Sequence, residues 1–151
     1  FPLSTKALSC LNSNQTNPSS FLVITCAHLL KAVSFLGFKP ELTTCIGCGK
    51  HIFEPSQSLN GSVSFSFLEG GSTCDSCAHE FETQWVACDV IQWAYTLLFS
   101  TFEEILTYSV GLETQLGLLR FLQSWIKIHL GYSLKSLTFI FSYGLQSSSC
   151  D

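Results

Sequence analysis

The stretches Cys45-Ile-Gly-Cys48-Gly49 and Cys74-Asp-Ser-Cys77 decide how this 151-residue chain is organised. Each has the CxxC spacing of a knuckle, a tight turn that presents two thiolates to one metal ion. Gly49 supplies the left-handed residue that such a turn needs. Two knuckles together place four thiolates at tetrahedral corners, so the sequence predicts one structural zinc ion held by Cys45, Cys48, Cys74 and Cys77.

Two alternatives to the four-sulfur site stay open at the level of sequence. His51 and His79 lie shortly after the two knuckles, so either could replace a thiolate. Two disulfides would use the same cysteines, but they require an oxidising compartment, and no signal-peptide pattern opens the chain. A metal ion with four thiolate ligands has no open coordination position, so we expect a structural role for it.

The segments before and between the knuckles differ in periodicity. Residues 21–36 carry apolar side chains at helical spacing, and Gly37 with Pro40 forms a typical helix end. The polar stretch Asn12 to Ser20 predicts a loop that ends in the N-cap of this helix. The alternation Val63-Ser-Phe65-Ser-Phe67 predicts a strand of a short hairpin between the knuckles, and Gly70-Gly71 predicts a turn that leads into the second knuckle.

Helical periodicity returns after Cys77, on a line of residues that includes Phe81, Trp85 and Cys88. Thr101-Phe-Glu-Glu104 has the spacing of a capping box and predicts a helix to about Ser109. A further helix is predicted from Leu112 to Leu130, with Glu113, Gly117, Arg120, Ser124 and Lys127 on its solvent face. Residues 132–144 are apolar and of undetermined type, and we expect a frayed serine-rich end.

These patterns predict a mostly α fold in one domain over residues 1–151. We expect helical parts over 1–42 and 78–151, and between them a protruding zinc-finger insertion, 43–77, with a short β-hairpin. The predicted core consists of Leu29, Phe35, Leu36, Trp85, Trp93, Leu97, Leu116, Leu119, Leu122 and Ile126.

The composition limits the classes of function. Apolar residues make up 46% of the chain and charged residues 12%, which excludes intrinsic disorder. Seven Lys and Arg against eleven Asp and Glu give a net charge of -4, so no overall basic field attracts nucleic acid or anionic membranes. No charge-free stretch forms an acceptable membrane span, so we expect a soluble protein without membrane association. The chain begins at Phe1 and contains no Met, so we expect a fragment.

No catalytic arrangement follows from the spacings. Neither a Ser/His/Asp set, nor paired carboxylates, nor a phosphate-binding glycine loop is present, so we expect no enzyme. Cys26 and Cys88 lie among apolar helical residues and indicate core packing. Arg120 and Lys127 share one helix face, which is either a solvated surface or a docking site for an anionic partner.

The order of the motifs resembles a known family. Leu29-Leu-Lys-Ala-Val-Ser-Phe-Leu-Gly37-Phe-Lys-Pro40-Glu-Leu42 is followed by CxxCG and then by Phe65-x-Phe67-x-x-Gly70-Gly71-x-x-Cys74-x-x-Cys77. This order resembles the C-terminal region of RecO, a family of bacterial recombination mediators and DNA repair proteins. The resemblance covers residues 21 to about 100, and His129-Leu-Gly131 and Leu134-Lys-Ser136 agree with it.

The resemblance implies an N-terminal OB-fold, which is missing here, followed by a helical domain that holds the zinc finger. It implies binding to single- and double-stranded DNA, strand annealing, contact with the acidic C-terminal tail of single-strand binding protein, and cooperation with RecR in loading RecA. It also implies a cytoplasmic, nucleoid-associated protein of a bacterium, with zinc on Cys45, Cys48, Cys74 and Cys77. The small number of Lys and Arg residues argues against direct DNA binding by this part of the protein.

Two functional hypotheses therefore stand. The first is a DNA-binding mediator whose main electrostatic surface lies in the absent OB-fold. The second is a zinc-stabilised protein-interaction module without DNA affinity of its own. We expect the chain to bind a short acidic peptide with an apolar end better than DNA, and to do so through Arg120 and Lys127.

Overall fold

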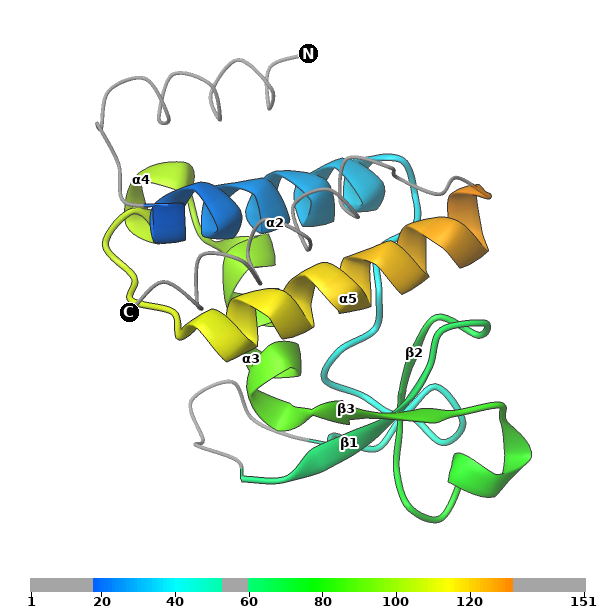
Figure 1. The fold of residues 1–151 in the computed structure, drawn as a ribbon. Helices are drawn as coiled ribbons and strands as arrows, with labels where there is room; N and C mark the ends of the chain where they lie inside the picture. The colour runs from blue at the N-terminus through cyan, green and yellow to red at the C-terminus, as the bar shows by residue number, and fades with distance from the viewer. Residues whose placement is uncertain (1–17, 53–59, 132–151) are drawn as a thin grey trace.

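The computed structural model describes residues 18–52 and 60–131. The elements follow in the order α2 (Pro18–Phe35), β1 (Ser62–Ser66), β2 (Gly71–Thr73), a 3₁₀ turn η1 (Ala78–Glu80), β3 (Gln84–Ala87), α3 (Cys88–Phe99), α4 (Phe102–Ile105) and α5 (Leu112–Leu130) (Figure 1). Of the loop predicted over Asn12 to Ser20, residues 12–17 lie outside the described residues, as does the chain after residue 131. The prediction is wrong for residues 18–20, which form the first turn of α2, because proline is tolerated at the start of a helix.

The three long helices α2, α3 and α5 form a small bundle in which each packs against the other two, and the short α4 packs on α2 (Figure 1). Their shared core is apolar and almost fully buried, and its large members are Ile24, Leu30, Ile91, Leu97, Leu118, Leu119 and Leu122. α5 is apolar around most of its circumference, because Phe121 and Trp125 face the sheet while the leucines face the other helices. A helix buried on several sides is the central element of a small domain.

The C-terminal ends of α2 and α5 and the start of α4 confirm the predicted signals. α2 ends before Gly37, which has a φ of 93° and allows Phe38 N to donate to Val33 O at 2.9 Å. The capping box at Thr101 and Glu104 is present, but α4 ends at Ile105 and is therefore shorter than predicted. α5 ends at Leu130, and the following Gly131 has a φ of 70°.

Within the described part of the chain, the sheet has three antiparallel strands in the order β2-β1-β3. The predicted hairpin is confirmed as β1 and β2, which pair from Ser64 opposite Thr73 to Ser66 opposite Gly71. The predicted helical pattern after Cys77 is wrong for residues 81–87, since residues 81–83 are irregular and residues 84–87 pair with β1 as β3. Pairing with a strand distant in sequence overrides the local helical spacing here.

Aromatic contacts join the sheet to the helices. The ring of Phe65 lies 4.9 Å from Phe67 and 5.0 Å from Phe121 of α5, measured between centroids. Phe65 is fully buried and belongs to the same core as the helices. The insertion therefore does not simply protrude: β1 packs on α5, and only the knuckle turns lie beyond the sheet (Figure 1).

Three members of the predicted core are exposed. Phe35 is 73% exposed and Leu36 57% exposed, because both lie where α2 ends and the chain turns away. Trp85 is 70% exposed because it lies on β3, at the edge of the sheet. The prediction is confirmed for the buried members Leu97, Leu119, Leu122 and Ile126, and Leu29, Trp93 and Leu116 are partly buried.

Candidate metal centre

The fold brings the four predicted ligands together. The Sγ atoms of Cys45, Cys48, Cys74 and Cys77 all lie within 4.8 Å of one another, and those of Cys48 and Cys74 are 3.8 Å apart. Zinc–sulfur bonds of about 2.3 Å at tetrahedral angles require sulfurs about 3.8 Å apart. The size and chemistry of this donor set therefore fit a tetrahedral metal ion.

Each knuckle is stabilised by its own backbone. In the first, Gly49 N donates to Cys45 O at 2.8 Å, and Gly49 has the predicted positive φ of 75°. In the second, Cys77 N donates to Cys74 O at 3.1 Å. Cys45 Sγ accepts from Gly47 N at 3.4 Å and from Cys74 N at 3.3 Å, so both knuckles direct an N–H at this one sulfur.

These contacts shift the pKa values of two of the clustered thiols in opposite directions. Burial alone would raise the pKa of Cys45, but N–H donation from Cys74, Cys48 and Gly47 outweighs burial and lowers the pKa to about 6. The thiol of Cys77 hydrogen-bonds to Cys74 and lies beside the other sulfurs, and this raises the pKa of Cys77 to about 12. Four adjacent sulfurs do not all ionise without a cation, which is the electrostatic requirement that a bound Zn²⁺ satisfies.

The two knuckles approach each other closely at Gly47. A Cβ added to Gly47 would lie 3.0 Å from both Cβ and Sγ of Cys77 and 3.2 Å from the ring of Phe81. A side chain at this position would force its neighbours to move by a few tenths of an ångström, so glycine is favoured by close approach to a ligand, although its φ lies outside the left-handed region.

Hydrogen bonds attach the first knuckle to the hairpin. Ile46 N donates to Ser72 O at 3.0 Å, and Ser72 Oγ donates to Leu42 O at 3.1 Å. Gly71 lies so close to the side chain of Ile46 and to Cβ of Glu41 that it has no space for a side chain of its own. The Gly70-Gly71 turn thus brings the second knuckle against the first.

Glu41 is a supporting residue that the sequence analysis missed. Its carboxylate accepts from Thr43 N at 3.3 Å and from Thr44 N at 3.2 Å. Partial burial would raise the pKa of Glu41, but the hydrogen bonds from Thr44 and Thr43 outweigh it and lower the pKa. The acidic residue four positions before Cys45 was the available signal, since carboxylates often accept from the N–H groups of a following turn.

Two hydrogen bonds that sequence reasoning also missed hold α5 against the chain before the first knuckle and against the hairpin. Trp125 Nε1 donates to Phe38 O at 2.9 Å, and His129 Nε2 lies 2.7 Å from Phe67 O. The two rings are 4.1 Å apart, as expected for residues four positions apart on a helix. His129 therefore has a structural partner.

The structure bears on both alternatives for the cysteines. The side chains that cluster are those of the four cysteines, and neither His51 nor His79 belongs to the cluster. Cys26, Cys45, Cys48, Cys74, Cys77 and Cys88 form no disulfides with one another. Cys26 and Cys88 are buried, as predicted for core residues.

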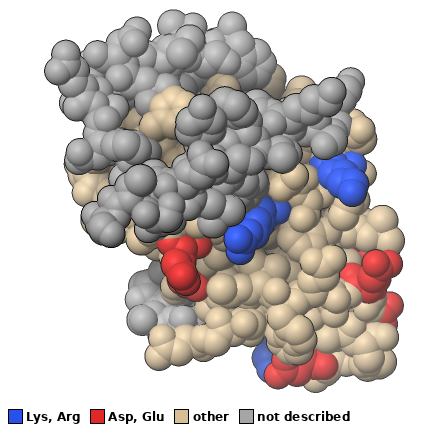
Figure 2. All heavy atoms as spheres, in the orientation of Figure 1, with Lys and Arg blue, Asp and Glu red and all other residues tan. Residues whose placement is uncertain are grey.

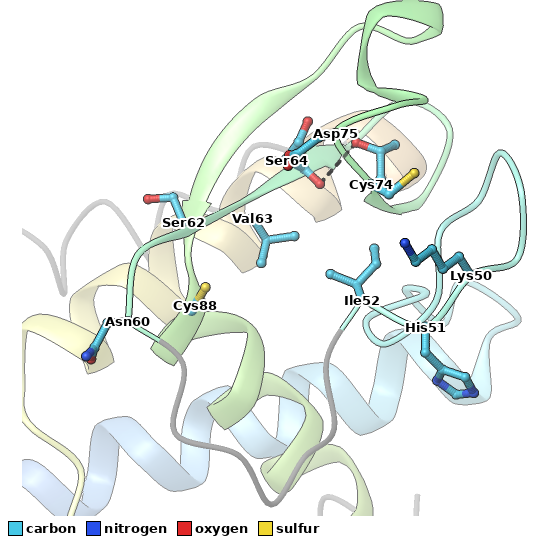
Figure 3. A pocket seen from close by; sticks show the side chains of 11 residues that line it. Lys50, His51, Ile52, Asn60, Ser62, Val63, Ser64, Cys74, Asp75 and Cys88 are labelled. Atoms are coloured by element: carbon cyan, nitrogen blue, oxygen red, sulfur yellow. Dashed lines mark hydrogen bonds between the residues drawn. The ribbon is translucent and has the colours of Figure 1, made fainter.

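Cys88 and Cys74 line the same cavity of about 320 Å³, but from different elements. Figure 3 shows Cys88 at the start of α3, away from Cys74 and from Lys50 of the first knuckle. Cys88 is therefore a natural control for experiments on the four clustered sulfurs.

The two predicted partner-binding cations are both exposed on α5. Seven positions separate Arg120 from Lys127, so they lie on one side of the helix about 10 Å apart along its axis. On the face that Figure 2 shows, basic side chains stand apart and form no continuous stripe. Gly117, predicted on the same solvent face, instead lies against Val90 of α3.

Fold and site together define a domain of helices and a small antiparallel sheet, with a four-cysteine cluster compatible with a metal site. The profile of the family "Recombination protein O C terminal" matches residues 1–138. The chain belongs to this family.

Relatives of the chain carry the name DNA repair protein RecO. The protein of Alkaliphilus metalliredigens is 32% identical over 106 residues, which is 69% of this chain and 40% of that protein. The protein of Desulforamulus reducens is 33% identical over 118 residues, or 73% of this chain and 41% of that protein. The protein of Symbiobacterium thermophilum is 42% identical over 56 residues, 37% of this chain and 21% of that protein.

The chain thus spans at most about two fifths of these relatives. No solved structure matches it. Among the residues that the structure describes, no helix has both the length and the apolarity needed to cross a bilayer.

Proposed function

We propose that this chain is the C-terminal part of a RecO-type DNA repair and recombination mediator that acts in the bacterial cytoplasm at the nucleoid. Membership of the recombination protein O C-terminal family is the observation that carries this proposal. The names of the relatives support it. In the proposed role the whole protein binds DNA mainly through an OB-fold outside this chain, and it cooperates with RecR in loading RecA and annealing strands.

The metal proposed for Cys45, Cys48, Cys74 and Cys77 is one zinc ion with a structural role. Support comes from the sulfur spacing and from the N–H groups directed at Cys45 Sγ. When bound, the ion supplies charge neutralisation and crosslinks the two knuckles. Four sulfur ligands leave no position for a substrate, so the proposed role is non-catalytic.

Within this role, we propose that the chain contacts the acidic tail of single-strand binding protein rather than DNA. The net charge of -4 disfavours a phosphate backbone over the whole molecule. A short acidic tail needs only a local cation beside an apolar surface.

Arg120 and Lys127 are the proposed cations. Lys31 Nζ already donates to Leu98 O at 2.9 Å, and Lys39 Nζ lies 4.6 Å from the ring centroid of Phe99. Lys50 follows the first knuckle and is the single lysine among residues 41–52 and 60–89, which contain six acidic residues. Arg120 and Lys127 are exposed, and Ile128, 43% exposed, offers apolar surface beside them.

The test is a titration of the zinc-loaded chain with two labelled probes at about 0.15 M salt. One probe is the tail peptide of single-strand binding protein, and the other is a single-stranded oligonucleotide. We expect micromolar affinity for the peptide, because one or two charge-assisted contacts of about 1.5 to 3 kcal/mol each are offset by the entropy of association. We expect weaker binding of the oligonucleotide.

Charge reversal locates the site. Arg120→Glu combined with Lys127→Glu should weaken peptide binding at least about tenfold. Lys50→Glu, which changes another exposed cation beside the first knuckle, should leave peptide binding unchanged. Tighter binding to the oligonucleotide would favour a chain with DNA affinity of its own. Unchanged peptide binding by the double variant would remove Arg120 and Lys127 from the site.

A further inference from the structure

The two outer edges of the sheet differ. Beyond β2, residue Glu41 forms a parallel bridge with Gly71, and Ser72 N donates to Glu41 O at 2.9 Å. β3 pairs with β1 on one side, and on its other side no strand pairs with it among the described residues. β3 is therefore an edge strand with an unpaired row of backbone groups.

The ladder shows which groups of β3 face outward. Cys88 N donates to Gly61 O at 2.9 Å, and this bond sets the alternation of the antiparallel pair. The backbone N–H groups of Val86 and Gln84, two and four positions before Cys88, therefore also point toward β1. Trp85 and Ala87 point their N–H groups away from β1, toward the position that a fourth strand would occupy.

This edge is open to solvent. Gln84, Trp85 and Ala87 are exposed, and Trp85 is 70% exposed. Exposed sheet edges are normally protected by a lysine, a proline or a bulge. β3 has neither lysine nor proline and instead presents a large aromatic side chain beside its outward N–H groups. Such an edge favours strand addition by an extended segment.

The charge around β3 indicates which kind of segment would bind to its outer edge. We define the finger lobe as residues 41–52 and 60–89, which contain six acidic residues and one lysine, a formal charge of -5. Glu80 and Glu82 lie just before β3 and Asp89 lies just after it. Bound zinc with four thiolates would make the lobe more acidic still. DNA and acidic tails are repelled here, and pairing with a second copy would bring the same acidic flanks together.

We propose that the outer edge of β3 binds an extended basic segment of a partner protein, which adds to the sheet as a fourth strand. The segment's backbone pairs with Trp85 and Ala87, an apolar side chain contacts the Trp85 ring, and Lys or Arg side chains meet Glu80 and Glu82. This inference goes beyond the proposed function, since it concerns the opposite charge and a surface other than the one around Arg120 and Lys127.

The test uses the zinc-loaded 151-residue chain and a capped peptide of about nine residues that alternates Lys and Val. Two control peptides have the same sequence and charge, with N-methyl groups on all valine amides or on all lysine amides. A strand pairs through one edge only, so we expect one control to bind at least about tenfold more weakly and the other to keep most of the affinity.

Ala87→Pro tests the edge in the protein. Ala87 has a φ of -58°, which proline adopts, and its N–H points outward, so the variant should keep its fold and its zinc. The proline ring occupies the space of the incoming strand, and we expect peptide binding to fall at least about tenfold. Ala87→Ser is the matched control and should bind like the parent chain.

Trp85→Thr is the second variant. It provides the test of the edge if Ala87→Pro loses its zinc or if its circular dichroism spectrum shows that it has not folded. Thr keeps the β-propensity and removes the aromatic contact, so binding should fall several-fold. Equal binding by all three peptides, or by the parent chain and both variants, would reduce the effect to charge attraction and overturn the proposal. Self-association that Ala87→Pro abolishes would assign the edge to a second copy instead, and oligonucleotide binding lost in Ala87→Pro would assign it to nucleic acid.

Discussion

Cys48 Sγ and Cys74 Sγ lie 3.8 Å apart, although 26 positions separate the two residues in the chain. A disulfide would hold its sulfurs at about 2.05 Å, whereas the edge of a zinc–sulfur tetrahedron is about 3.8 Å. The hairpin of β1 and β2 creates this proximity, because its turn returns the chain to the first knuckle. The distance therefore argues that the two sulfurs share a metal ion and that they do not form a disulfide bond.

The first prediction concerns this cluster. Cys48→Ser should lose zinc and the folded state together, because roughly 10 to 16 kcal/mol of metal-binding free energy supports such sites in small peptides. Cys88→Ser should retain one zinc per chain, since Cys88 lies outside the cluster. Metal analysis and circular dichroism of both variants provide the measurement. X-ray absorption of the parent chain should show only sulfur neighbours, and a nitrogen neighbour would contradict the proposed ligand set.

The cluster was predictable because its signal is local. CxxC spacing, Gly49 and the Val63-Ser-Phe65 alternation each encode a turn or a strand within a few residues. β3 was not predictable in this way. Phe81, Trp85 and Cys88 are spaced like one face of a helix, and residues 84–87 form a strand only because β1 lies beside them. The sequence alone does not contain that pairing.

The second prediction compares two leucines that the sequence pattern placed in the core. Leu119 is fully buried and Leu36 is 57% exposed. Leu119→Ala should lower the free energy of unfolding by about 2 to 5 kcal/mol, while Leu36→Ala should change it by less than about 0.5 kcal/mol. Urea unfolding of the zinc-loaded proteins measures both. Comparable losses for the two identical side-chain truncations would show that the end of α2 is packed.

The third prediction concerns pH. Burial raises the pKa of Cys26 from 9.0 to about 12, so the folded chain keeps a proton that the unfolded chain loses. The contribution of Cys26 to stability is therefore complete below pH 9 and decreases as the pH rises toward 12, by about 1.4 kcal/mol per pH unit.

The measurement is urea unfolding at pH 8 and at pH 10 for the parent chain and for Cys26→Ala. Lysines and tyrosines titrate in both proteins, so their effects cancel in the comparison. The parent chain should lose about 1.4 kcal/mol more than the variant between the two pH values. Equal losses would mean that Cys26 ionises in the folded state as readily as in the unfolded state.

The supporting residues of the cluster were less predictable than its ligands. Gly47 matters because of the atoms around it, namely Cys77 and Phe81, and not because of its own backbone angles. Glu41 acts through the N–H groups of Thr43 and Thr44. Contacts of this kind depend on how the two knuckles meet, which the spacing of cysteines does not specify.

The fourth prediction concerns the contact between α3 and α5. A Cβ added to Gly117 would lie 2.6 Å from Cγ2 of Val90, closer than any relaxed contact. Alanine in a helix interior is favoured over glycine by about 0.8 to 1.0 kcal/mol, but overpacking of a core costs about 1 to 3 kcal/mol. Gly117→Ala should therefore destabilise the parent chain by up to about 2 kcal/mol.

The sign should reverse once the obstructing methyl groups are removed. In a Val90→Ala background the Cβ that Gly117→Ala introduces has space, so this substitution should stabilise that protein by up to about 1 kcal/mol through helix propensity. Both effects come from urea unfolding of the four proteins of this double-mutant cycle, and the expected coupling is about 1 to 3 kcal/mol. If Gly117→Ala stabilised both backgrounds alike, the contact between Gly117 and Val90 would not limit the approach of α5 to α3, and the solvent-exposed position that the helical pattern predicts for Gly117 would be correct.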